Sequence, residues 1–139
     1  GSASKGAYEE SMLRGSGTDT RQSNPQLGLV ALEDEWRAAP SLNAYYPAPR
    51  SWSDLTRLAP LICRLAGVSE DARLRAVDRM GQQAAAVAIA VTFEKHSRDE
   101  VKSPGGYLRA MTDRAESGEL PLSRSVFGLV ARNQMEALN

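Results

Sequence analysis

The residues with the clearest capacity for chemistry lie in one short segment, VKSPGGYLR at positions 101–109. Ser103 is a good N-cap, because its hydroxyl can accept a hydrogen bond from a backbone N–H of the following turn. Pro104 suits the first helical position, where its missing N–H is not needed. Gly105 and Gly106 each cost about 1 kcal/mol relative to alanine inside a helix. Two glycines in one first turn therefore indicate that the backbone must stay bare there.

Two interpretations of this helix start are open. In the first, exposed N–H groups at the positive end of the helix, with Lys102 and Arg109 nearby, bind a phosphate group. In the second, the two glycines allow another helix to approach closely, and Tyr107 and Leu108 belong to the core. The segment lacks the spacings G-x-x-x-x-G-K-S/T and G-x-G-x-x-G, so nucleotide binding is poorly supported.

Further basic side chains are candidates for contact with DNA. Arg75 and Arg79 follow Asp71 at four-residue spacing and so share one face of a predicted helix. The alternative is a solvated face with one Asp71–Arg75 ion pair, which would contribute little to stability. Arg98 and Arg114 complete the set of candidate DNA-binding residues.

Charge and composition limit the classes of function. The 139 residues include 17 basic and 17 acidic side chains, which argues against an arm that holds nucleic acid by charge alone. DNA binding is therefore expected to be weak or shared with another segment. One cysteine, Cys63, and one histidine, His96, leave no internal disulfide and no zinc ligand set.

The remaining signals of catalysis and targeting are missing from the sequence. We find no nucleophile with a base pattern, no paired carboxylates in an apolar setting and no metal motif. We therefore predict a protein that is not an enzyme and that needs no cofactor or metal. Because no run of about eighteen apolar residues and no signal-peptide core is present, we expect a cytoplasmic protein without a membrane partner.

The chain divides into a tail and one helical domain. Residues 1–26 are rich in Ser, Gly, Thr, Asp, Gln and Asn, and we expect a disordered linker whose first two residues are a cloning remnant. Such a start suggests a fragment of a larger protein. Residues 27–139 are predicted to form a single domain.

Apolar residues at three- and four-residue spacing predict an all-α fold, a compact bundle of about six helices with a helix-turn-helix or winged-helix arrangement as one option. The predicted helices span residues 27–39, 51–66, 69–80, 82–98, 103–116 and 123–139. The helix at 82–98 is apolar nearly all round, which predicts a central position. Pro60 is expected to kink or split its helix, and Ser123 to cap the last one.

The order of these motifs resembles that of a known family. The stretch VKSPGGYLRAMTDRAESGELPLSRSVFGLV is similar to the C-terminal region of the plasmid replication initiator RepC, from the RepABC replicons of alphaproteobacteria. Further blocks that match in the right order are RSWSDL at 50–55, LAGVS at 65–69 and RMGQQAAAVAIAV at 79–91. The resemblance covers about residues 38–130. Leu120, where the family usually has Phe, and Arg124-Ser125, in place of its Gly-Pro, depart from the pattern.

The resemblance implies an accessory C-terminal domain of an initiator for a low-copy plasmid, without catalysis. The main origin-binding part of that family is an N-terminal winged-helix region, which this chain lacks. We hypothesise that the domain contributes to origin DNA binding and initiator assembly, through Lys102 and Arg109 above all. The alternative is a protein–protein interaction or dimerisation module that docks on host replication factors without touching DNA. Expected partners are origin DNA, further copies of the chain and host replication proteins.

Overall fold

Six α-helices and one short 3₁₀ helix make up the secondary structure of residues 30–120 and 122–138, the part that the computed structural model describes. They are α2 (Leu32–Ala38), the 3₁₀ helix η2 (Pro40–Ala44), α3 (Trp52–Ala66), α4 (Glu70–Met80), α5 (Gln82–Ser97), α6 (Pro104–Glu116) and α7 (Leu122–Ala137). Because this part contains no β-strand, the predicted all-α fold is confirmed, and no winged helix is formed within it. The predicted linker 1–26 and the start of the expected helix 27–39 lie outside the described residues.

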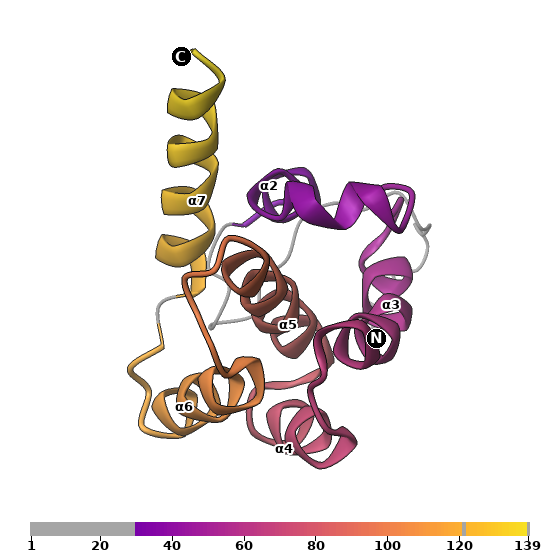
Figure 1. Cartoon of the computed structure of the whole chain (residues 1–139). Helices are drawn as coiled ribbons and strands as arrows, with labels where there is room; N and C mark the ends of the chain where they lie inside the picture. The colour runs from indigo at the N-terminus through magenta and orange to yellow at the C-terminus, as the bar shows by residue number, and fades with distance from the viewer. Residues whose placement is uncertain (1–29, 121, 139) are drawn as a thin grey trace, which may run out of the picture.

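The central element is α5. All residues of the segment 84–94 are buried, and five of them are alanines, whose small side chains let neighbouring helices approach closely. Figure 1 shows α5 surrounded by the other helices, and α2, η2, α3, α4, α6 and α7 all contact it. The predicted central position is therefore confirmed, since a helix without a polar face must be covered on all sides.

α3 continues unbroken through Pro60, so a split helix, one of the two expected outcomes, is not found. The proline removes one backbone hydrogen bond. However, the helix buries Leu55 before the proline and Ile62 after it, and it packs against α5, which holds the two halves together. At the N-terminus the Ser51 hydroxyl accepts a hydrogen bond from the Asp54 N–H at 3.0 Å, which caps the helix.

A three-residue turn joins α3 to α4. Gly67 has a φ of 77°, in the left-handed region that favours glycine, and Val68 is buried. Ser69 caps α4, because its hydroxyl accepts from the Ala72 N–H at 3.1 Å. A short turn containing glycine between two helices is one feature of a helix-turn-helix motif. Gly81 alone separates α4 from α5.

α7 packs along α2 and α5 through the buried residues Leu122, Val126 and Leu129. The helix begins at Leu122, so the prediction that Ser123 caps it is wrong. Leu122 is fully buried, and its anchoring in the core accounts for helical structure that starts one residue before the expected cap. The C-terminal part of α7 reaches beyond the rest of the bundle (Figure 1).

Candidate nucleic-acid interface

The start of α6 has the capped geometry that its sequence predicts. The Ser103 hydroxyl accepts a hydrogen bond from the Gly106 N–H at 3.1 Å, and Pro104 occupies the first helical position. One of the N–H groups that a helix start leaves free is therefore satisfied by the cap. Pro104 has no N–H, and the Tyr107 N–H donates to the Ser103 carbonyl at 2.9 Å. Within residues 104–107 the Gly105 N–H is therefore the one left at the positive end of the helix dipole.

The two glycines of this turn are not packed against another helix. A methyl group added at Gly105 would meet nothing within 4 Å, and one added at Gly106 would meet only the Ser103 side chain, with its Oγ at 2.9 Å. The interpretation that these glycines allow another helix to approach is therefore wrong. The same interpretation placed Tyr107 and Leu108 in the core, and this part is right, because Leu108 is fully buried and Tyr107 is half-buried. Burial raises the pKa of the Tyr107 hydroxyl.

The two basic residues beside this turn differ in their surroundings. Lys102 is exposed and forms no ion pair with the described residues. Arg109, one and a half turns into α6, lies 3.5 Å from the Asp71 carboxylate of α4. Both side chains are exposed enough to reach an external ligand, but Arg109 is already paired with a carboxylate of the described chain, whereas Lys102 is not.

Ion pairs connect α4 and α6 along their exposed sides. Asp71 faces Arg109, Arg75 lies 3.9 Å from Asp113, and Arg79 contacts Glu116. Residues further along α4 therefore face residues further along α6, so the two helices run parallel and begin at the same end of the pair. Figure 1 shows them side by side.

This arrangement changes the interpretation of the basic face of α4. The alternative interpretation expected Arg75 to pair with Asp71 in its own helix. Arg75 instead pairs with Asp113 and Glu116 of α6. Arg79 also pairs with the neighbouring Asp78 at 3.2 Å. These pairs are exposed, and each contributes little to stability. They nevertheless surround both arginines with carboxylates.

Arg98 belongs to a different cluster, between α5 and α7. Its Nε donates to Glu94 at 2.6 Å, and its Nη1 lies 3.2 Å from Glu136. It also donates to Asn133, whose amide donates to the Arg37 carbonyl of α2 at 3.0 Å. The hydrogen bond with Glu94 raises the pKa of Arg98, whose side chain is partly buried.

The nine candidate residues do not form one patch, because five lie within residues 102–109 and the other four lie elsewhere, with Arg79 beside Glu116 at the far end of α6. Residues 102–109 supply Lys102, the Ser103 cap, the two glycines and Arg109 at the start of α6, with Arg75 and Arg79 along the neighbouring helix. Arg114, in the last turn of α6, is exposed and forms no ion pair with the described residues. Arg98 is engaged in the cluster at α7.

Two buried glutamates stand out that the sequence patterns did not single out. Glu94 accepts from Arg98 and, through its other oxygen, from the Ser41 N–H at 2.9 Å. Glu35 of α2 is fully buried, and neither of its carboxylate oxygens has a hydrogen-bond partner in the described part of the chain. Burial raises the pKa of Glu35 to about 8, so the carboxyl is mostly protonated at neutral pH.

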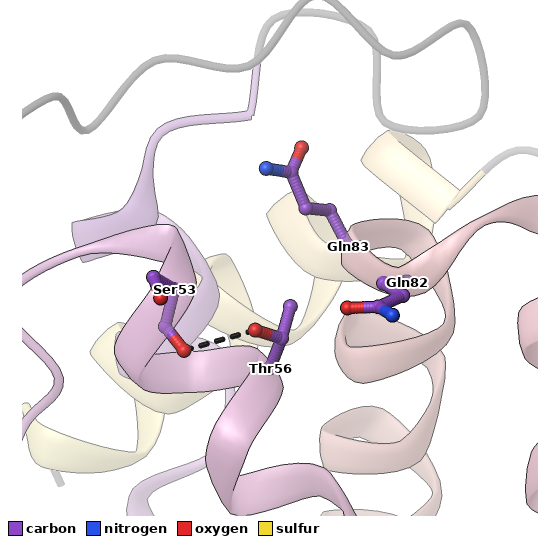
Figure 2. Close-up of a pocket in the computed structure, with 4 residues that line it drawn as sticks. All are labelled: Ser53, Thr56, Gln82 and Gln83. Carbon is purple, nitrogen blue, oxygen red and sulfur yellow. Dashed lines mark hydrogen bonds between the residues drawn. The ribbon is translucent and has the colours of Figure 1, made fainter.

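A polar hollow of about 400 Å³ lies between α3 and the start of α5. Figure 2 shows the residues that line it, Ser53 and Thr56 from α3 and Gln82 and Gln83 from α5. The Thr56 hydroxyl donates to the Ser53 carbonyl at 2.9 Å. These lining groups are neutral donors and acceptors, which suit water or a polar ligand but include no acid or base that could drive a reaction.

Residues 30–120 and 122–138 contain neither a membrane-spanning helix nor a metal-binding cluster. No helix there is long and apolar enough to cross a bilayer. No three His, Cys, Asp or Glu side chains gather there in a way that could hold a metal ion.

The fold and the site together define an all-helical domain with one helix start at which bare backbone and basic side chains face solvent. The family model described as Replication protein C C-terminal region matches residues 31–132. Since the match covers well over half of the chain, the chain belongs to the replication protein C family. The resemblance drawn from the sequence motifs is thereby confirmed.

Similar proteins agree with this family. A protein of Rhizobium rhizogenes is 36% identical over 96 residues, and one of Sinorhizobium fredii is 38% identical over 98 residues; both carry the name "Putative replication protein C". The aligned parts cover 68% and 67% of this chain but only 23% and 22% of those proteins, so the chain spans less than a quarter of their length. No solved structure matches the chain.

Proposed function

We propose that this chain is an accessory domain of a plasmid replication initiator and that it contacts phosphates of origin DNA through the start of α6. The observation that carries the proposal is the bare first turn, in which nothing packs on Gly105 and only the cap touches Gly106. A phosphate group can approach such a backbone closely, and Lys102 forms no ion pair with the described residues.

The position of α4 supports the proposal that DNA binds at the start of α6. α4 and α6 are parallel, so the positive ends of two capped helices lie at one end of the pair. α4 also follows α3 after a short turn containing glycine, as the second helix of a helix-turn-helix motif does, and in many DNA-binding proteins that second helix enters the major groove. Its acidic first turn, with Glu70 and Asp71, limits the attraction of this surface for DNA.

The balanced charge of the chain limits its expected affinity for DNA. With a formal net charge of zero, the chain contacts few phosphates, so binding is weak and its salt dependence is shallow. The relatives are more than four times longer than the aligned part, so the rest of such a protein is available to supply most of the affinity for DNA. We propose a binding role, not a catalytic one, for this domain.

The test is fluorescence anisotropy with labelled origin duplex and scrambled duplex, at low and moderate salt. The variant Lys102→Ala/Arg109→Ala is compared with Arg50→Ala/Arg57→Ala, which removes the same charge at the start of α3. Loss of binding in the first variant alone supports the α6 surface. Equal loss in both variants indicates attraction by overall charge, and no binding at about 50 µM removes DNA contact from the isolated chain.

A further inference from the structure

α7 has a second apolar face that the bundle does not cover. Its inner face buries Leu122, Val126 and Leu129 against the core, and polar residues further along it join the cluster around Arg98. The opposite face exposes Phe127, which is 44% exposed, and Met135, which is 64% exposed. A helix that serves only as an outer wall is expected to be polar on that side.

The exposed residues on this outer face follow the spacing of a helix–helix seam. Five of them recur at intervals of four, three, four and three residues, which is the heptad pattern of coiled coils. We call these five residues the α7 seam: Arg124, Gly128, Ala131 and Met135 in α7, and Leu138 directly after its last residue. Phe127 flanks the seam. Figure 1 shows that α7 extends past the bundle, so the seam is accessible along much of its length.

Gly128 is the residue that the isolated bundle does not explain. It lies inside α7, where glycine costs about 1 kcal/mol relative to alanine. A methyl group added at this position would meet nothing within 4 Å in the chain itself, so no contact of the described bundle requires a glycine. Close approach of another helix would require one, because its side chains need room there.

We propose that the α7 seam binds the α7 seam of a second copy of this chain in antiparallel orientation, with the two Ala131 residues at the crossing point. The seam is complementary to itself in this orientation. Gly128 of one copy lies across from Met135 of the other, a small residue against a large one, and this contact occurs twice. The two alanines meet at the centre, where small side chains permit close packing.

The charges fit the same orientation. Arg124 is exposed and forms no ion pair with the described residues. In the antiparallel pair it lies beside the last turn of the second copy's α7, where unpaired carbonyl groups form the negative end of the helix. A parallel pair would instead place the two Arg124 side chains together. The antiparallel arrangement is therefore the favoured one.

An interface of one helix from each copy is small, below about 1,200 Å² in total, so the dimer is expected to be weak and reversible. It does not depend on the proposed DNA contact, because Lys102 and the start of α6 lie outside the seam. In a longer protein, pairing of α7 from two copies would link two initiator molecules. This contact would give initiator assembly a structural basis.

The test is sedimentation equilibrium of the 139-residue chain from about 5 to 500 µM, a range suited to interfaces of this size. Ala131→Glu places two carboxylates at the crossing point, and Gly128→Gln fills the space for the second copy's Met135. Each is expected to raise the dissociation constant of the dimer by at least about tenfold. Ala110→Glu, on the exposed side of α6, is the matched control and should leave it unchanged.

Disulfide trapping gives an independent readout. Ala131→Cys places one exposed thiol at the crossing point, while the native Cys63 is buried. Under mild oxidation this variant should form a covalent dimer that reductant reverses, and Ala110→Cys should not. Circular dichroism checks that each variant is folded. A wild-type chain that remains monomeric to about 500 µM, or a dimer that is indifferent to both seam substitutions, overturns the proposal.

Discussion

Glu94 and Arg98 form a 2.6 Å hydrogen-bonded ion pair at the point where α5, η2 and α7 meet. The Glu94 side chain is only 1% exposed, and its second oxygen accepts from the Ser41 N–H. Arg98 extends the pair to Glu136 of α7. A single charged pair thus ties the central helix to two elements that are distant from it in the sequence.

We expect Arg98→Ala to lower the free energy of unfolding by about 3–5 kcal/mol, because it leaves the Glu94 carboxylate buried without a cation. Urea unfolding measures the change. The control Arg114→Ala removes an exposed arginine without an ion pair in the described part of the chain, and should change stability by less than about 0.5 kcal/mol. The double variant Arg98→Ala/Glu94→Gln should regain part of the loss. Equal stability of the two single variants would contradict this role for Arg98.

Because the pKa of Glu35 is raised, we predict that the stability of the chain depends on pH in an unusual way. Its pKa is raised from 4.5 to about 8 in the folded chain, so between these values the unfolded chain releases a proton that the folded chain keeps. The free energy of unfolding therefore falls as the pH rises across this window, by up to about 1.4 kcal/mol per pH unit. Glu35→Met should remove that slope and raise stability at pH 7. Urea unfolding at pH 5, 6, 7 and 8, compared with the exposed control Glu33→Met, gives the difference.

Gly105→Ala should stabilise the chain and weaken the proposed DNA contact. The added methyl meets nothing within 4 Å, so the helix gains up to about 1 kcal/mol from the better helix former. Thermal unfolding should show a higher midpoint, and anisotropy should show weaker binding to duplex. Gly106→Ala is the contrasting variant, because its methyl would lie 2.9 Å from the Ser103 Oγ and disturb the cap. Higher stability with unchanged DNA binding would contradict the proposed use of the bare turn.

Gly67→Ala should destabilise the connection between α3 and α4 by about 1 kcal/mol, because Gly67 has a φ of 77° and a side chain strains that conformation. Gly67→Asn should cost less, since asparagine tolerates the left-handed region better. Chemical denaturation of both variants beside the wild type measures the two losses. A larger loss for asparagine than for alanine would be inconsistent with this explanation.

Much of the fold follows from signals that act within three or four residues. The caps Ser51, Ser69 and Ser103 each accept from an N–H three positions later, so the sequence around each one suffices to predict a helix start. The unbroken run of apolar side chains in α5 likewise predicts burial on all sides. The order of motifs was enough to recognise the replication protein C family.

By itself, then, the sequence determined the all-α class, the starts of α3, α4 and α6 and the family, because these depend on local hydrogen bonds and on residue order. Only the tertiary structure decided which charges meet. Asp71 and Arg109 are 38 positions apart, and no periodicity within one helix could reveal that α4 and α6 run parallel. The same holds for the pairing of Arg98 with α7, the continuity of α3 through Pro60 and the open space around Gly105. Each depends on which surfaces pack together, and packing brings together residues from distant parts of the chain.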